Sequence, residues 1–251
     1  MTALTRFLLR ISQSINFRLK NRQRRDVLRG TPLAAAGYPS LDGSELLQLL
    51  QAAPPAVIYD LGANRGHWTL LAKSWFPRAE VHGFEPLPAH CIEFKEHTVA
   101  LAQVHLHPVA LGEAAAELEM DLTSFSDSAS LLPLTATMTE TYGVRPGRKQ
   151  RVPVVRLDDW VESHGLPAPD LIKLDLQGYE LAALRGAPRC LQHARAVLLE
   201  LSFREYYSGQ PLPGALLAHL EAAGFRLTAF SPDIPAGRTL EQADALFLKI
   251  S

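Results

Sequence analysis

Cysteine is scarce in this chain, which has two cysteines, Cys91 and Cys190, among its 251 residues. Because they stand far apart in the sequence, they provide neither a disulfide framework nor a set of metal ligands, and a reducing compartment is expected. No apolar stretch approaches the ~18 uncharged residues that a membrane span requires. With 47% hydrophobic residues, the composition also excludes disordered and collagen-like chains. A chain of this length can bury one sizeable core without disulfides.

Net charge is nearly absent, at −1, but the charges are unevenly distributed. Residues 1–30 carry eight Lys or Arg residues and one acid, whereas the rest of the chain carries 17 basic and 25 acidic residues. The sequence therefore predicts a basic arm, residues 1–31, on an acidic domain, residues 32–251. We expect no nucleic acid partner, because phosphate binding favours a basic stripe across the fold.

The arm has the pattern of an amphipathic helix. Its apolar residues recur at spacings of three and four and share one face: Leu4, Leu8, Ile11, Ile15 and Leu19. Such a face packs on the domain or on a second copy of the chain, or lies on an anionic membrane surface. Residues 20–31, polar and basic, are expected to form a hinge or a loose linker. Because arginines interrupt the apolar run, we expect no signal peptide and a cytoplasmic protein, free or peripheral at the membrane.

From about residue 56, short apolar runs alternate with stretches of helical spacing. The runs predict strands at 57–61, 80–84, 104–109, 171–175 and 197–201, and the stretches predict helices at 67–75, 88–100, 178–185 and 212–223. This alternation favours an α/β fold with a doubly wound, mostly parallel sheet. Two apolar runs, at 225–230 and 245–250, are joined by a Pro/Gly-rich loop and predict an antiparallel final strand.

One stretch departs from the alternation. Nine of the residues from Thr123 to Thr141 are Ser or Thr, and the segments on either side, 117–122 and 150–157, look extended. The pattern predicts an inserted hairpin with a long polar loop at its tip, over about 123–149. A loop of this length is typical of a lid or a disordered segment, and we expect it to influence the choice of acceptor.

A glycine-containing turn follows the first strand, with the sequence Asp60-Leu-Gly-Ala-Asn-Arg-Gly66. Gly62 and Gly66 permit a tight turn and a close approach of backbone to ligand, and the helix that follows offers unpaired N–H groups. Asn64 can adopt the left-handed conformation where a middle glycine is expected. A nucleotide-like ligand is therefore expected at this turn.

The acids near the turn distinguish between two nucleotides. A dinucleotide fingerprint G-x-G-x-x-G would need glycine where the chain has Asn64 and His67. The Asp60 carboxylate suits the ammonium group of S-adenosylmethionine and would repel a pyrophosphate. Glu85, after the second strand, can accept hydrogen bonds from the ribose hydroxyls of either cofactor. S-adenosylmethionine is favoured, and an NAD-type oxidoreductase is the alternative.

Four segments in this order resemble the FkbM-family methyltransferases: 60–66, Phe84-Glu-Pro86, Ala110-Leu-Gly112, and Leu171-Ile-Lys-Leu-Asp-Leu-Gln-Gly-Tyr-Glu180 followed by Leu184-Arg-Gly186. The resemblance covers about residues 56–230. It implies a class I, Rossmann-like, S-adenosylmethionine-dependent fold and O-methylation of a sugar or another small biosynthetic hydroxyl. Gln177 departs from the family pattern, in which Glu is common.

With the turn, the resemblance implies a set of donor-binding residues. They are Asp60, Gly62, Ala63, Asn64, Gly66, Glu85, Pro86, Ala110 and Ser128. The implied partner is a small-molecule or glycan acceptor.

The chemistry requires a group that holds or deprotonates an acceptor hydroxyl. Lys173 and Asp175 share one face of a strand, and Asp175 stands at the carboxyl end, where ligands bind in such sheets. Glu200 lies near the end of the next strand. We expect Asp175 to act on the hydroxyl, with Lys173 and Glu200 setting its charge state. The alternative is that Lys173 forms a buried ion pair with an acid and fixes the strands.

Two histidines, His105 and His107, alternate on one strand face, a spacing compatible with two metal ligands. No third ligand is evident at a matching position in the sequence. We therefore predict no metal site and interpret both as hydrogen-bonded strand histidines. The remaining alternative from another class is membrane or RNA binding through the basic arm.

Overall fold

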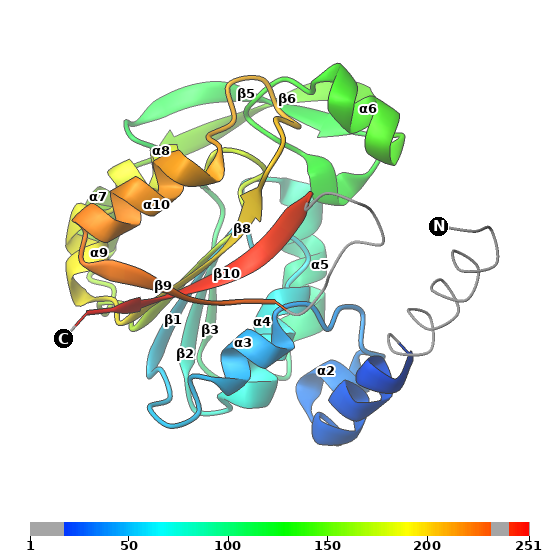
Figure 1. The fold of residues 1–251 in the computed structure, drawn as a ribbon, viewed down its shortest axis with the longest axis vertical. Helices are drawn as coiled ribbons and strands as arrows, with labels where there is room; N and C mark the ends of the chain where they lie inside the picture. Colours follow the sequence, from blue (N-terminus) through cyan, green and yellow to red (C-terminus); the bar gives the residue numbers. More distant parts are fainter. Residues whose placement is uncertain (1–17, 232–240, 251) are drawn as a thin grey trace, which may run out of the picture.

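The computed structural model describes residues 18–231 and 241–250. Its centre is a seven-stranded sheet in the order β3-β2-β1-β7-β8-β10-β9 (Figure 1). The strands are β1 (Val57–Leu61), β2 (Glu80–Phe84), β3 (Val104–His107), β7 (Leu171–Leu174), β8 (Ala196–Ser202), β9 (Phe225–Phe230) and β10 (Gln242–Lys249). All seven strands predicted from the apolar runs are present.

The last strand, β10, lies between β8 and β9 and is antiparallel to both. The pairs β1–β2, β1–β7, β2–β3 and β7–β8 are parallel. The prediction of a mostly parallel sheet with an antiparallel final strand is confirmed. The strand order reverses direction between β1 and β7, and such a switch point opens a crevice at the carboxyl ends of the strands.

Helices cover both faces of this sheet (Figure 1). One face carries α7 (Leu157–His164), α8 (Glu180–Arg185), α9 (Pro188–His193) and α10 (Pro213–Ala222), and the other carries α2 (Pro32–Ala35), α3 (Ser44–Gln48), α4 (His67–Trp75) and α5 (Pro88–Thr98). Each face has its own apolar core, and Ile172 and Leu198, from neighbouring strands, belong to opposite cores. Among the described residues, no helix is both long and apolar enough to cross a membrane.

The expected linker at residues 20–31 is largely ordered structure. Residues 18–27 are helical, and Leu28 is buried in the same core as Leu33 and Leu46. Arg24 is also buried and forms an ion pair of 2.7 Å with Glu45. The polar composition led to a wrong prediction, because the charge of Arg24 is neutralised by Glu45, which lies twenty-one residues away in the sequence. The amphipathic pattern of the arm falls mostly on residues 1–17, outside the described part, so the boundary at residue 31 stays a prediction.

The insertion forms a second sheet of three strands, β4-β6-β5. Strands β5 (Ala116–Thr123) and β6 (Pro146–Val155) are antiparallel, as predicted, and β4 (Ala110–Leu111) pairs with β6. The tip is not the long loop expected from its polar composition, because it contains the 3₁₀ helix η1 (Ser126–Ser128) and α6 (Ala136–Tyr142). Thr135 caps α6 by accepting a hydrogen bond from the Met138 amide, and Met138 is buried against Tyr206 and Tyr207. Tertiary packing thus orders this segment.

The turn after β1 passes very close to the end of β7. Gly62 has a φ of +77°, and a Cβ placed on it would lie 1.9 Å from the backbone carbonyl oxygen of Asp175. No side chain fits there without moving one of the two strand ends. Gly62 is therefore required by sterics as well as by conformation.

We predict that Gly62→Ala destabilises the protein far more than Gly143→Ala. Gly143 has a similar φ of +71°, but a Cβ on it would meet nothing within 4 Å. Gly143→Ala should therefore cost only the conformational strain, about 1–2 kcal/mol, while Gly62→Ala adds the backbone clash. Urea unfolding of both variants measures the difference, and equal losses would contradict the close approach.

Candidate active site

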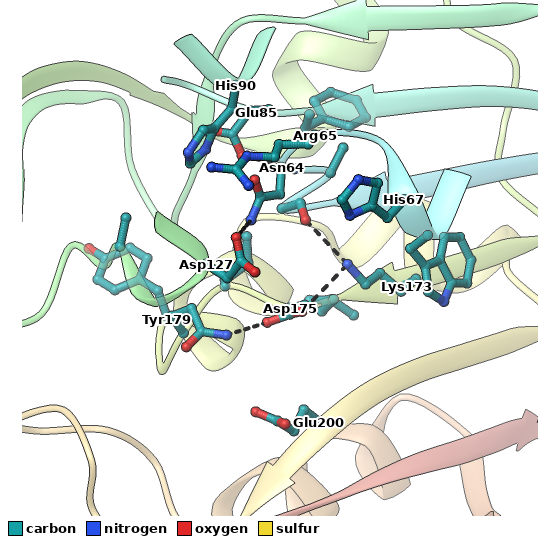
Figure 2. A pocket seen from close by; sticks show the side chains of 18 of the residues that line it. Asn64, Arg65, His67, Glu85, His90, Asp127, Lys173, Asp175, Tyr179 and Glu200 are labelled. Atoms are coloured by element: carbon teal, nitrogen blue, oxygen red, sulfur yellow. Dashed lines mark hydrogen bonds and ion pairs between the residues drawn. The ribbon is translucent and has the colours of Figure 1, made fainter. Parts of the chain in front are cut away.

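A cavity of about 930 Å³ opens at the carboxyl ends of the parallel strands. Small-molecule sites are usually clefts of ~300–1,000 Å³, so this one has room for a cofactor and an acceptor together. Figure 2 shows its side chains converging from two sides, with Asn64 and Glu85 on one side and Glu200 on the other. The strand order explains this arrangement. Strands β1 and β2 lie on one side of β7, whereas β8 and β10 lie on its other side.

The turn after β1 lines one end of the cavity with Gly62, Ala63 and Asn64. Asn64 has a φ of +48°, so it does occupy the left-handed region expected of it. Gly66, in contrast, is not part of the lining. It begins α4, and a Cβ on it would lie 2.9 Å from the Phe94 ring, so its role is to let α4 pack against α5.

Glu85, at the end of β2, is buried and lines the cavity. Its carboxylate accepts hydrogen bonds from the backbone amides of Asn64, at 3.0 Å, and Leu87, at 2.9 Å. His90 Nδ1 lies 3.4 Å from the same carboxylate. These contacts fix the carboxylate beside the glycine turn, and its remaining lone pairs can accept hydrogen bonds from a ligand.

An apolar wall adjoins Glu85. It includes two of the predicted residues, Pro86 and Ala110, and others that the sequence did not single out: Phe84, Leu87, Val109, Leu111, Met120, Ala129 and Leu131. Several of these come from the inserted sheet, which packs its own core against this end of the cavity. A flat, apolar ring such as a purine fits a wall of this composition.

The insertion reaches the turn through η1. Asn64 Nδ2 donates to Asp127 Oδ1 at 3.2 Å, and Arg65 donates to Ser126 Oγ at 2.7 Å. Ser126 and Asp127 line the cavity, but the predicted Ser128 does not. Its carbonyl oxygen instead accepts a hydrogen bond from the Tyr207 hydroxyl. The cavity lining therefore gives no support to Ser128, whose contact with a donor stays a prediction.

Asp60 lies beneath the cavity and does not line it. It is fully buried, its Oδ2 accepts a hydrogen bond from Thr69 Oγ1 at 2.7 Å, and its Oδ1 lies 3.1 Å from Lys173 Nζ. Asp60 therefore exposes no surface to the cavity, and its contact with the ammonium group of a donor stays a prediction. Lys173 also donates to the Gly62 carbonyl oxygen at 3.2 Å. Burial alone would lower the pKa of Lys173, but the Asp60 and Asp175 carboxylates raise it.

Asp175 lines the cavity with 44% of its side chain exposed. Its Oδ2 lies 3.8 Å from Lys173 Nζ, and its Oδ1 accepts a hydrogen bond of 2.6 Å from Gln177 Nε2. Gln177 in turn accepts a hydrogen bond of 2.7 Å from the Tyr207 hydroxyl. The amide at position 177 therefore donates to Asp175, which a carboxylate could not do when ionised. Tyr207 was not predicted, and no local sequence signal pointed to it.

Glu200 lies across the cavity and accepts a hydrogen bond of 2.7 Å from Gln242 Nε2. Burial raises its pKa well above the ordinary value, and the nearby Asp175 and Asp244 carboxylates add to the rise. Glu180 is buried as well, and burial raises its pKa to about 6. It accepts hydrogen bonds from the amides of Leu176 and Gly178, which shapes the loop after Asp175.

The far end of the cavity contains residues that the sequence analysis did not identify. They come from the N-terminal segment, α4 and β10: Lys20, Ser40, Asp42, Trp68, Gln242 and Asp244. None belongs to a motif, and the first three precede the region of family resemblance. His67, at the start of α4, also lines the cavity.

We predict that Lys173→Met destabilises the protein by about 3–5 kcal/mol, because it leaves the buried Asp60 carboxylate without its partner. The control is Arg185→Met, which breaks an exposed pair of 3.4 Å with Glu113 and should cost about 0–1 kcal/mol. Urea unfolding at neutral pH compares the two. Similar, small losses in both variants would show that Asp60 does not depend on Lys173.

Comparisons with known proteins agree with this geometry. The family model described as "Methyltransferase FkbM domain" matches residues 60–227. The 2-O-methyltransferase NoeI of Sinorhizobium fredii is 29% identical over 75% of this chain and 79% of that protein. The hexuronic acid methyltransferase AglP of Haloferax volcanii is 27% identical over 62% of this chain and 59% of that protein.

Among solved structures, methyltransferase FkbM from Methylobacillus flagellatus superposes with a TM-score of 0.52 at 15% identity. The match covers 77% of this chain and 43% of that one, and supports the class I methyltransferase fold. The family match rules against the alternative of an NAD-type oxidoreductase, for which the turn already lacked two glycines. With a model match that runs from the end of β1 to β9, the chain belongs to the FkbM methyltransferase family.

Proposed function

We propose that this methyltransferase moves the methyl group of S-adenosylmethionine to a hydroxyl of a sugar or a similar small polyhydroxyl acceptor. The observation that carries the proposal is the cavity itself, which joins a nucleotide-type end, at Gly62 and Glu85, to a polar end, at Asp175 and Glu200. The relatives NoeI and AglP, named for 2-O-methylation and for a hexuronic acid, favour a sugar acceptor.

The residues present fit the donor. Glu85 would hold the ribose hydroxyls, the apolar wall around Ala110 would hold the adenine, and the turn from Gly62 to Asn64 would hold the methionine end. A side chain at position 62 is sterically impossible, which leaves the backbone open to close approach. Asn64 Oδ1 is buried and has no hydrogen-bond partner among the described residues, so it is available to an N–H or O–H group of the methyl donor. When bound, the donor supplies an electrophilic methyl group on sulfur.

Asp175 is the residue that we expect to act on the acceptor. Its partly exposed carboxylate can accept a hydrogen bond from an acceptor hydroxyl and take the proton as the oxygen loses it. Lys173 Nζ lies 3.8 Å from Asp175 Oδ2, and Gln177 fixes the orientation of the carboxylate through the hydrogen bond to Oδ1. Burial raises the pKa of Glu200, which favours its neutral form beside the Asp175 carboxylate.

The charges at the polar end favour an uncharged acceptor. Besides Glu200, the carboxylates of Asp42 and Asp175 line it, and the two lysines nearby are already in ion pairs. Lys173 lies 3.1 Å from Asp60, and Lys20 lies 3.9 Å from Glu45. A sugar carboxylate would therefore meet net negative charge. We propose a neutral polyhydroxyl acceptor, in contrast to the hexuronic acid named for AglP.

We predict that Asp175→Asn lowers kcat by about 10²–10⁴-fold, the usual contribution of a positioned base. The affinity for S-adenosylhomocysteine should stay nearly unchanged, because Asn can still accept the hydrogen bond from Gln177. Transfer of a labelled methyl group to a sugar pool measures kcat, and calorimetry measures the affinity for S-adenosylhomocysteine. Asp159→Asn, an exposed aspartate on α7, is the control. Turnover at the wild-type rate would exclude Asp175 as the base.

We also predict a preference of at least tenfold in kcat/KM for a neutral pyranoside over the matching uronate. The cause is Coulomb repulsion between the uronate carboxylate and the carboxylates of the cavity, so added salt should reduce the ratio of the two kcat/KM values. Asp42→Asn should also reduce this ratio at low salt. The measurement compares kcat/KM for pairs of acceptors that differ only at C6. A preference for the uronate would contradict the proposed acceptor class while leaving methyl transfer itself intact.

A further inference from the structure

A cluster of metal-ligating side chains lies on the edge of the sheet, apart from the cavity. His82 on β2 is in register with His105 on the edge strand β3, and Glu80 precedes His82 by two residues and so shares its face. None of the three lines the cavity. His105, which the sequence analysis considered as a metal ligand, therefore lies beside the buried His82 and the Glu80 carboxylate of the neighbouring strand β2.

The spacing of the three ligand atoms suits a small ion. Glu80 Oε1 lies 3.1 Å from His82 Nε2 and 3.4 Å from His105 Nε2, and all three atoms lie within 4.8 Å of one another. In a tetrahedral zinc site, bonds of about 2.0–2.2 Å place ligand atoms roughly 3.4 Å apart. Two of the three separations, at 3.1 and 3.4 Å, are close to this length, and the third is at most 4.8 Å.

A supporting shell is present behind His82. His82 Nδ1 lies 3.0 Å from His107 Nε2, and Trp160 Nε1 donates to His107 Nδ1 at 3.2 Å. Metal-binding histidines almost always use the second ring nitrogen in such a hydrogen bond, which fixes the ring orientation. His82 and His107 also stack, with ring centroids 5.3 Å apart. The ring of the inner ligand is therefore held in place before an ion arrives.

The outer side of the cluster is open. His82 is buried, whereas the side chains of His105 and Glu80 are 50% and 31% exposed. An ion from solution can therefore reach the two outer ligands directly.

We propose that Glu80, His82 and His105 bind one Zn²⁺ ion through three protein ligands, with the fourth position open to water. Two imidazoles and one carboxylate form a donor set that zinc favours over magnesium. The site is independent of the proposed methyl transfer, because none of its three ligands lines the cavity.

Binding requires a tautomer change that can be observed. Trp160 can only donate, so without metal His107 carries its proton on Nε2 and His82 on the nitrogen facing Glu80. Zinc takes that nitrogen, so the His82 proton moves to Nδ1 and is donated to His107 Nε2. The His107 proton then moves to Nδ1, and the Trp160 indole loses its acceptor. No proton is lost from the pair of rings, and Trp160 reports the event.

The experiment titrates ZnCl₂ into the full chain, free of tags and stripped with a chelator, and follows calorimetry and tryptophan fluorescence. We expect one ion per chain with micromolar or tighter affinity and a fluorescence change that Trp160→Phe abolishes. His105→Ala and Glu80→Gln change the exposed ligands and should each weaken binding at least tenfold. MgCl₂ should give no signal.

The matched control is His193→Ala, an exposed histidine on α9, which should bind zinc as the wild type does. Circular dichroism of each variant establishes that it is folded. Absence of stoichiometric binding at 100 µM zinc, or equal affinity in His105→Ala and the wild type, would overturn the proposal. Cobalt substitution provides a second measurement, because tetrahedral Co²⁺ absorbs visible light and the absorbance should be lost in His105→Ala.

Discussion

The buried pair of Asp60 and Lys173 is the constraint on which the site depends. Both side chains lie between the ends of β1 and β7, and Lys173 also binds the carbonyl oxygen of Gly62. A charge in this position costs free energy unless a partner and hydrogen bonds satisfy it, so the two strand ends are held in one arrangement. This arrangement also fixes the positions of the turn from Gly62 to Asn64 and of the loop that starts at Asp175. The cavity opens between them.

From this junction the two ends of the cavity acquire different chemistry. Toward β2, Glu85 is fixed by backbone amides and faces an apolar wall, which suits a nucleoside. Toward β8 and β10, carboxylates predominate and one of them, Glu200, is driven by burial toward its neutral form. The two ends of the cavity differ because the strand order places β2 beside β1 and β8 beside β7, on opposite sides of the β1–β7 pair. The same order puts the histidine cluster on the far edge, at β2 and β3.

Local patterns were sufficient for the central sheet and for four of the helices that cover it, α4, α5, α8 and α10, but not for the N-terminal segment and the tip of the insertion. Apolar runs predicted the strands because buried parallel strands leave little freedom in their composition. The N-terminal segment and the tip of the insertion were predicted as loose because they are polar. Arg24 is nevertheless buried against Glu45, and Met138 is buried in one cluster with Tyr206 and Tyr207. Such contacts join residues far apart in the chain, and no local window contains them.

The sequence by itself determined the fold class, the turn after β1, the carboxylates at positions 85, 175 and 200, and the family resemblance, because each depends on residue types at short, fixed spacing. Tertiary structure decided which of these groups face the cavity. It buried Asp60 against Lys173, turned Ser128 away, and brought Asp42 and Asp244 to the site. It also set Glu80 beside His82 and His105. The physical reason is that burial and charge pairing arise from neighbours in space, which only the packed sheet defines.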